Sequence, residues 1–279
     1  MKVLVTGVSG QLGFDVMREL LARGIEAKGA SRSDFSLTDF AAMRRFVEAH
    51  RPTAIIHCAA YTAVDKAEDE PELCREVNAA ATGELARLAK EIGAKFLYIS
   101  TDYVFPGTGE DFYEPEDEKA PCNVYGESKL LGEEAALEAL EELFIVRISW
   151  VFGENGKNFI KTMLRLAETH EELSVVGDQI GSPTYTRDLA RLLADMIETE
   201  KYGVYHATNE GTCSWAELAK EALRCAGKKT RVRAIKTEEY PTKAKRPKNS
   251  RLSKKCLDDA GFSRLPDWRD AVARYVDLI

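Results

Sequence analysis

A glycine-rich turn between an apolar strand and an amphipathic helix constrains the fold of this chain more than any other feature. The turn, Gly7-Val8-Ser9-Gly10-Gln11-Leu12-Gly13, follows the apolar run 3–5, and apolar residues then recur at helical spacing over 12–21. Glycine permits a tight turn and lets the backbone approach a pyrophosphate, whose charge the N-terminus of a helix favours. The sequence therefore predicts a dinucleotide site, and the alternative is a merely structural turn.

The same alternation of short β-rich runs and helical segments repeats along the chain and weakens after Trp150. It is typical of an α/β fold in which a parallel, doubly wound, Rossmann-like sheet carries helices on both faces. The further predicted strands are 54–58, 95–100, 144–148 and 202–206, and the further predicted helices are 74–92, 124–139, 158–168 and 187–199.

A length of 279 residues suits a nucleotide-binding domain with a smaller second lobe. We predict that residues 1–150 form the NAD(P)-binding Rossmann domain, to which 184–208 return. The segments 151–183 and 209–279 are then expected to form a smaller, C-terminal substrate-binding lobe.

Composition narrows the class of partner. The formal net charge of −7 argues against a general nucleic-acid or membrane-surface binder, so small molecules or other proteins are expected. The sequence has no signal-peptide pattern and no apolar run long enough to span a membrane. Its six scattered cysteines and four histidines show no ligand spacing, which favours a reduced, cytoplasmic protein without a metal site. Both a monomer and a homodimer fit these observations.

Two residues four positions apart, Tyr125 and Lys129, are candidates for acid–base chemistry. On a helix this spacing puts the phenol and the ammonium on one face, where the cation favours the phenolate. Thr101, at the end of the apolar run 95–100, would lie at the carboxyl end of the sheet, where ligands bind. Each feature alone has a simpler interpretation, solvated helix residues or a turn. Together they form a hydroxyl, a phenol and an ammonium that suit proton transfer to a carbonyl.

The residues after the second predicted strand bear on the choice of cofactor. An NAD-specific site usually places an acid about 20 residues beyond the glycines, to bind the ribose hydroxyl. This chain has Ser31 and Arg32 in that neighbourhood, which suits the 2′-phosphate of NADPH, and NADH remains an alternative if Asp34 takes the acid's place.

Three other features admit two interpretations each. Trp150, after an apolar strand, suits either the core or a platform for a sugar ring. The basic stretch 243–251 is either a solvated loop or a site at which Arg246 binds a diphosphate. The polar segment 106–121 is either a surface loop or a loop that flanks the substrate.

These motifs resemble the extended short-chain dehydrogenase/reductases, and within them the family of dTDP-4-dehydrorhamnose reductases. The resemblance covers most of the chain and is strongest before residue 160. The segments that carry it are Gly10-Gln11-Leu12-Gly13, Asp34-Phe35, 59–68, 100–105, 125–133, Ser149-Trp150-Val151-Phe152 and 246–250.

The resemblance implies reduction of the C4 keto group of dTDP-4-dehydro-L-rhamnose to dTDP-L-rhamnose. Tyr125 would give the proton to the C4 oxygen beside Thr101, and Lys129 would bind the nicotinamide ribose and lower the pKa of the tyrosine. The implied cofactor contacts are Gly7, Gly10, Gln11, Leu12, Gly13, Asp34, Phe35, Ala59, Ala60 and Tyr61, and the implied substrate contacts are Thr101, Asp102, Trp150, Arg246 and Asn249.

Two alternatives stay open at this point. A nucleotide-sugar epimerase or dehydratase would use the same scaffold, but a dehydratase usually carries Asp-Glu after the hydroxyl, whereas Asp102 is followed by Tyr103 here. The other alternative is a non-catalytic, NADP-binding regulatory subunit, similar to the β subunit of methionine adenosyltransferase. The presence of Thr101, Tyr125 and Lys129 argues against that second class.

Overall fold

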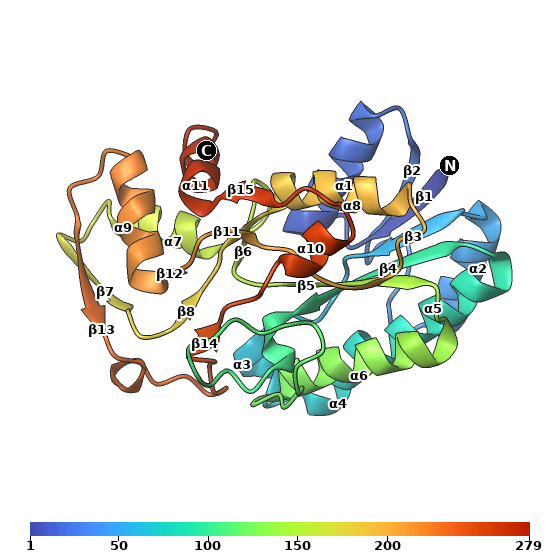
Figure 1. Cartoon of the computed structure of the whole chain (residues 1–279), viewed down its shortest axis with the longest axis horizontal. Coiled ribbons are helices and arrows are strands. Elements are labelled where there is room, and N and C mark those ends of the chain that lie inside the picture. Colours follow the sequence, from blue (N-terminus) through green and yellow to red (C-terminus); the bar gives the residue numbers. More distant parts are fainter.

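The computed structural model describes residues 1–279, and its centre is a six-stranded sheet in which every pairing is parallel (Figure 1). Its strands are β1 (Lys2–Thr6), β2 (Glu26–Ala30), β3 (Ala54–His57), β4 (Lys95–Thr101), β5 (Leu143–Ile148) and β10 (Gly203–His206). The spatial order is β10-β5-β4-β3-β1-β2, so the chain reverses its direction of winding between β1 and β3. Ligands of open α/β sheets bind outside the carboxyl ends of the strands at such a reversal.

Helices cover both faces of this sheet because its strands are apolar on both sides (Figure 1). In β1, Val3 and Val5 belong to one buried cluster, whereas Leu4 belongs to the other. The prediction of a doubly wound, parallel, Rossmann-like sheet is therefore confirmed. The first cluster includes residues of α1 (Gln11–Ala22), α8 (Thr186–Ile197) and α10 (Lys255–Asp259), and the second includes residues of α2 (Phe40–His50), α5 (Ala81–Ile92) and α6 (Val124–Ala139).

The helix predicted at 74–92 is interrupted, which is the main local difference from the sequence-based prediction. It is divided into α4 (Pro71–Arg75), a π-helical segment η1 (Glu76–Ala80) and α5. Such π segments are frequent at functional sites. Here the segment carries Asn78, whose side chain accepts the Tyr61 N–H at 2.8 Å and donates to the Tyr61 carbonyl at 3.0 Å. The π turn thus supports the backbone that follows β3.

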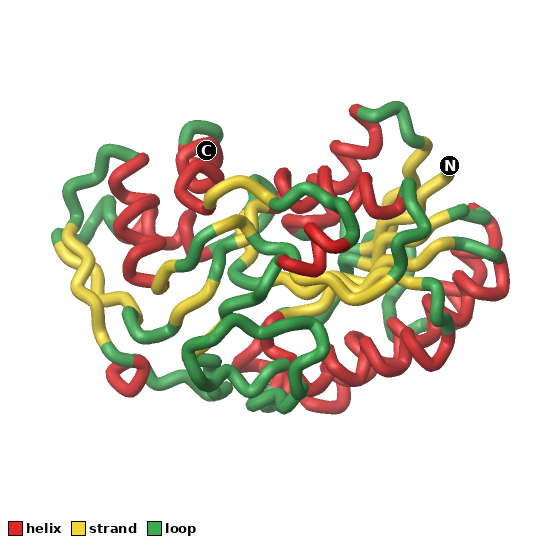
Figure 2. The backbone as a smooth tube through the Cα atoms, viewed as in Figure 1, coloured by secondary structure: helices red, strands yellow, loops and turns green.

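Most residues after Trp150 build a smaller group of elements beside the sheet (Figure 2). This group has its own apolar clusters, one around Trp268 and Tyr275 and another around Leu173 and Leu223. By contrast, β10 joins the main sheet and α8 packs on α1. The elements of the group are β6 (Val151–Phe152), α7 (Phe159–Leu166), β7 (Glu172–Val176), β8 (Ile180–Gly181), β9 (Thr184–Tyr185), β11 (Asn209–Glu210), β12 (Cys213–Ser214), α9 (Trp215–Cys225), β13 (Arg231–Ile235), η3 (Thr237–Glu239), β14 (Asn249–Ser250), β15 (Leu265–Asp267) and α11 (Trp268–Val276).

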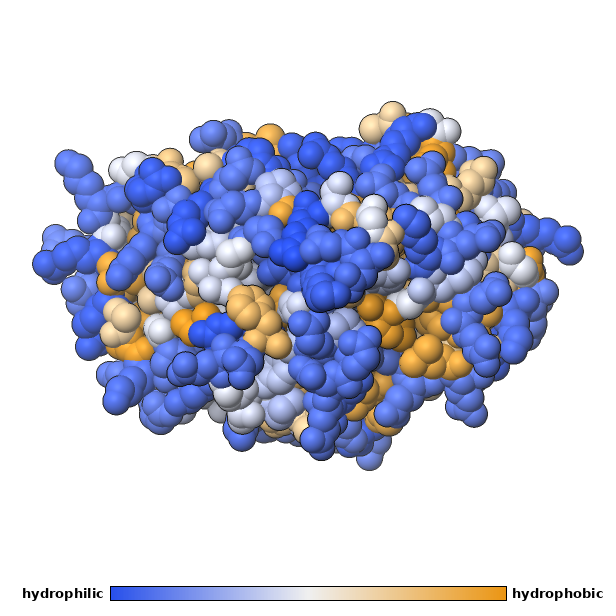
Figure 3. Space-filling model, in the orientation of Figure 1, coloured by the Kyte–Doolittle hydropathy of each residue, from blue (hydrophilic) through white to orange (hydrophobic).

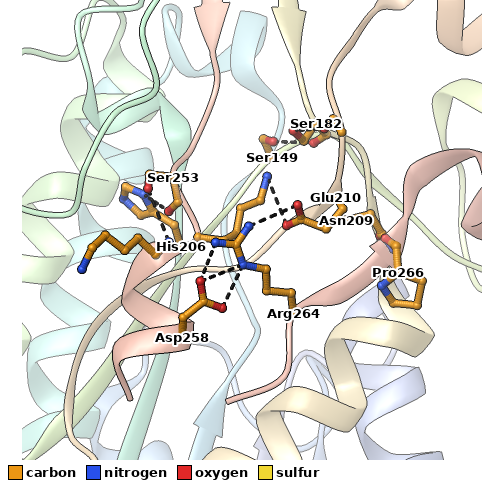
Figure 4. Close-up of polar contacts among 12 residues, drawn as sticks. Ser149, Ser182, His206, Asn209, Glu210, Ser253, Asp258, Arg264 and Pro266 are labelled. Carbon is orange, nitrogen blue, oxygen red and sulfur yellow. Dashed lines mark hydrogen bonds and ion pairs between the residues drawn. The ribbon is translucent and has the colours of Figure 1, made fainter. Parts of the chain in front are cut away.

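Ionic contacts fix the C-terminal segment against the rest of the molecule. Figure 4 shows the guanidinium of Arg264 between the carboxylates of Asp258 and Glu210. Its Nε donates to Asp258 Oδ1 at 2.9 Å and its Nη1 donates to Glu210 Oε2 at 3.3 Å. Arg264 thus links Asp258 of α10 to Glu210 of β11. Because such charges face solvent, each exposed pair adds only about 0–1 kcal/mol.

The surface is mostly polar. Figure 3 shows one face on which hydrophilic side chains predominate and apolar side chains form separate patches. None of the helices combines the length and the apolar character that crossing a membrane requires.

Because two of its histidines are buried, we expect the protein to become less stable in acid. Burial lowers the pKa of His57 and of His206 to about 3, whereas histidine in an unfolded chain titrates near roughly 6.5. Between these values the unfolded chain binds more protons than the folded one, so the free energy of unfolding falls as the pH is lowered from about 6.5 toward 3.

The variant His206→Gln tests this expectation, because the glutamine oxygen can still accept from Arg147 Nη1, which lies 3.4 Å from His206 Nε2. Urea denaturation at a series of pH values should show a fall in stability that is shallower than in the wild type by up to about 1.4 kcal/mol per pH unit. An unchanged slope would contradict the assignment to His206.

Candidate active site

A cavity of about 1030 Å³ lies where the sheet reverses its winding, at the carboxyl ends of β1, β3 and β4. It brings together residues from the glycine turn, from the strand ends and from α6. The residues singled out in the sequence that line it are Gly7, Gly10, Gln11, Leu12, Gly13, Arg32, Phe35, Ala59, Ala60, Tyr61, Thr101, Asp102, Tyr125, Lys129 and Trp150.

The glycine turn forms one wall of this cavity with its backbone. Gly7 has φ +72 and donates its N–H to the Ala30 carbonyl at 2.9 Å. A Cβ on Gly13 would lie 2.4 Å from the Gly7 carbonyl oxygen, so no side chain fits there. Helix α1 begins after Gly10, which provides no side-chain acceptor for the first N–H groups. Those N–H groups stay available to an anion.

Tyr125 lies in the first turn of α6. The helix begins there because the Asn123 side chain accepts the Gly126 N–H at 2.8 Å. The Tyr125 ring packs edge-on against Tyr103, with centroids 5.6 Å apart. Burial raises the pKa of the Tyr125 phenol well above its usual value, and the hydroxyl of Thr101 offsets part of that rise. The phenol therefore holds its proton at neutral pH and is suited to donate it.

Lys129 lies one turn further along α6 and is 2% exposed. Its Nζ donates to the Ile99 carbonyl at 2.7 Å and lies 4.0 Å from the centroid of the Tyr98 ring. Burial lowers the pKa of this ammonium to about 7, against the opposing charge of Glu133. Desolvation of the phenolate is the largest influence on Tyr125, so the net pKa of its phenol is raised, and an assisting effect of Lys129 on that phenol stays a prediction.

Asp102 carries a carboxylate oxygen without a partner. Its Oδ1 accepts from the Thr101 hydroxyl at 3.0 Å, whereas Oδ2 is buried and has no hydrogen bond. The Ser100 hydroxyl is also buried and unpaired. Burial raises the pKa of Asp102 to about 6. Because buried polar atoms are rarely left unpaired, these two oxygens indicate a place where a ligand supplies hydrogen bonds.

Arg32 and Asp34 differ in their position relative to the cavity. Arg32 is exposed, lines the cavity and forms no ion pair within the chain. Asp34 instead accepts hydrogen bonds from the N–H and the hydroxyl of Ser31, at 2.8 and 2.9 Å, and does not line the cavity. The Asp34 carboxylate thus folds the turn that presents Arg32, and the predicted contact of Asp34 with the adenosine stays a prediction.

Comparison with known proteins agrees with this geometry. A family model described as the RmlD substrate binding domain matches residues 1–279. A dTDP-4-dehydrorhamnose reductase of Escherichia coli is 40% identical over 292 residues, which cover 99% of this chain and 97% of that protein. The chain belongs to the dTDP-4-dehydrorhamnose reductase family. The spore coat polysaccharide biosynthesis protein SpsK of Bacillus subtilis is also 40% identical, over 99% of this chain and 96% of its own length.

A solved structure of the family shows the same fold with a cofactor. The dTDP-4-dehydrorhamnose reductase of Bacillus anthracis, in complex with NADP, superposes with a TM-score of 0.97 and is 41% identical, with all of both chains covered.

This chain has a second cavity, of about 700 Å³, and Arg246 is one of the residues that line it. Residues 106–110 line it, so the polar segment flanks a cavity. Arg246 Nη2 is held by Asp65 Oδ2 at 2.7 Å. Asn249 lines neither cavity: it is 2% exposed and donates to the Asp111 carbonyl at 2.8 Å. Asn249 therefore holds the loop in this structure, and its contact with the substrate stays a prediction.

The sequence-based analysis missed Trp215, which also lines the main cavity. Its ring stacks on that of Trp150 at a centroid distance of 3.9 Å and an angle of 18°. Trp150 itself has φ +50, a strained conformation for a bulky residue, and such strain is common at ligand sites. The only local signal for Trp215 was an aromatic residue directly after a helix cap, Ser214, in the segment where the family resemblance was weakest.

Proposed function

We propose that this protein reduces the C4 keto group of dTDP-4-dehydro-L-rhamnose to give dTDP-L-rhamnose, with NADPH as the reductant. The observation that carries the proposal is that Thr101, Tyr125 and Lys129 line the same cavity as the glycine turn. The names of the relatives support the substrate and the reaction. The six cysteines, all unpaired, support a reducing, cytoplasmic setting.

The residues of the cavity fit a dinucleotide. The uncapped start of α1 suits a pyrophosphate, the close approach at Gly13 leaves the backbone bare, and Arg32 suits a 2′-phosphate. Phe35, Ala59, Ala60 and Tyr61 complete the cofactor wall. When bound, NADPH supplies the hydride for the ketone carbon. The NADP complex of the Bacillus anthracis relative supports this choice, and NADH is the weaker alternative.

Tyr125 provides the proton. An alkoxide is a far stronger base than a phenolate, so a phenol that keeps its proton at neutral pH can still donate it to the C4 oxygen. The Thr101 hydroxyl, which donates to Asp102 in the free protein, turns to stabilise the phenolate that forms, in keeping with its effect on the pKa of Tyr125. Lys129, whose Nζ is fixed by the Ile99 carbonyl, lies close to this site and is placed to bind the nicotinamide ribose. Asp102 offers its free oxygen to a sugar hydroxyl.

The smaller group of elements supplies the substrate side. The Trp150 and Trp215 pair gives an aromatic face for the sugar ring, and the second cavity contains Lys245, Arg246, Lys248 and Arg251 for the diphosphate end. Residues 151–183 and 209–279 thus constitute the substrate-binding lobe of our proposal, and 184–208 belong with the Rossmann domain.

A turnover assay tests the proposal. Purified protein with NADPH should consume the cofactor only when dTDP-4-dehydro-L-rhamnose is added. A panel of other dTDP-ketosugars defines specificity, and the C4-reduced sugar should be recovered as the product. Failure to oxidise either NADPH or NADH would remove the proposed function. Interconversion of sugar epimers without net loss of cofactor would favour an epimerase instead.

Replacement of Arg32 should change the cofactor preference. In Arg32→Ala the 2′-phosphate loses a charge-assisted contact of roughly 1.5–3 kcal/mol, so the KM for NADPH should rise roughly tenfold or more, whereas the KM for NADH should stay near its original value. Initial rates with both cofactors measure the ratio. Glu26→Ala, an exposed change at the start of β2, serves as the control. An equal effect of Arg32→Ala on both cofactors would count against recognition of the 2′-phosphate by Arg32.

A further inference from the structure

A segment of the smaller lobe lies against the phosphate-binding turn. Asn155 Nδ2 donates to the Ser9 carbonyl at 2.9 Å and to the Gly10 carbonyl at 3.3 Å. Asn155 does not line the cavity, but Gly10 and Ser9 do. The contact therefore joins the smaller lobe to the cofactor wall, across 145 residues of sequence.

These two hydrogen bonds set the orientation of two peptide groups. The N–H and C=O of a trans peptide point in opposite directions. The Gly10 carbonyl accepts from Asn155 and also from the Phe14 N–H at 3.3 Å, so the N–H of Gln11 in the same peptide is directed away from Asn155, and Gln11 lines the cavity. The peptide between Ser9 and Gly10 is held at both of its polar groups. Its C=O accepts from Asn155, and its N–H donates to the Gly7 carbonyl at 2.9 Å.

The segment around Asn155 is itself held in place. The carboxylate of Glu154 accepts from Arg18 of α1 at 2.7 Å and also pairs with Arg187 of α8. Asn158 caps α7 by accepting the Lys161 N–H at 3.0 Å, and its Nδ2 lies 3.0 Å from Gln11 Oε1. The position of the Asn155 amide is therefore imposed by its surroundings, and a fixed donor orients its acceptors more effectively than a mobile one.

We propose that Asn155 is a positioning residue for the cofactor: from the smaller lobe, it aligns the Gln11 N–H of the phosphate-binding turn with the pyrophosphate. The inference rests on the proposed function in one respect, that the turn binds NADPH. Asn155 does not line the cavity and has no hydrogen bond to Thr101, Tyr125 or Lys129, so its effect should appear in cofactor affinity and not in the chemical step.

Titration of the full-length protein with NADPH, followed by its fluorescence, tests the proposal. Asn155→Ala removes both hydrogen bonds and should raise the Kd for NADPH roughly fivefold, with a matching rise in KM. The kcat at saturating NADPH should stay within about twofold of the wild type, since the loss is one of binding. Asn155→Asp keeps the shape but puts an anion against two carbonyls, so its effect on Kd should be larger. Glu168→Ala, an exposed change on the same lobe, is the control.

The outcomes separate the inference from the proposed function. If wild-type protein does not bind NADPH, the proposed function fails, and this inference with it. If wild-type protein binds NADPH and both Asn155 variants bind it equally well, only the role of Asn155 is overturned. A lower melting temperature of the variants with an unchanged Kd would also overturn it, because that pattern indicates a purely structural contact.

Discussion

The Tyr125→Phe enzyme should lose turnover by roughly 100- to 10,000-fold, the usual contribution of a positioned general acid. The change removes one oxygen from a phenol that burial keeps protonated and that lies beside the Thr101 hydroxyl. Phenylalanine keeps the edge-on packing against Tyr103, at 5.6 Å, so the fold of α6 should be preserved. The affinity for NADPH should change little, because the glycine turn and Arg32 are untouched.

Single-turnover measurements with saturating NADPH check this expectation, since they isolate the chemical step from binding and release. Tyr202→Phe is a matched control, because Tyr202 packs on Phe144 and does not line the cavity. A Tyr125→Phe enzyme that turns over like the wild type would remove the phenol from its role as proton donor.

Gly13→Ala should reduce the affinity for NADPH by roughly 100-fold or more, since the glycine at this position is needed for close packing of the helix on the turn. The added Cβ would lie 2.4 Å from the Gly7 carbonyl oxygen and 2.7 Å from the Gly7 carbonyl carbon. Both are backbone atoms and cannot rotate away, so α1 or the turn must move and the N–H groups leave their positions.

Gly24→Ala provides the matched control for this change. Gly24 also has a positive φ, of +70, but no atom lies within 4 Å of an added Cβ there. It should lower stability by about 1 kcal/mol and leave the Kd for NADPH as it was. Equilibrium titrations of both variants, with their melting temperatures, decide the point. Wild-type affinity in Gly13→Ala would show that the turn is not the cofactor site.

Local sequence patterns were sufficient for the frame of the molecule. The alternation of strands and helices predicted the parallel sheet because its central β-rich runs are buried on both faces, as Val3 and Leu4 show. The glycine turn was predictable because only glycine tolerates the approach at Gly13. Thr101 and Tyr125 were brought to one cavity by a rule that needs no coordinates, since the ends of parallel strands meet at one edge of the sheet.

What could not be predicted depends on partners distant in the sequence. The Asn249 amide, for example, donates to the Asp111 carbonyl, 138 residues earlier in the chain. A side chain's type does not reveal which neighbour uses its hydrogen bonds. The direction of the pKa shift of Tyr125 could not be predicted from the sequence either. Helical spacing gives the separation of two side chains but not the desolvation of each, and here desolvation decides the direction of the pKa shift.

The most direct test of the central claim is to follow the transferred hydrogen. We would incubate the protein with dTDP-4-dehydro-L-rhamnose and NADPH that carries deuterium at the transferable position of the nicotinamide, and analyse the sugar by NMR. The account predicts dTDP-L-rhamnose with one deuterium, bound to C4. Deuterium at another carbon, or a product that retains the C4 ketone while the cofactor is unchanged, would contradict it.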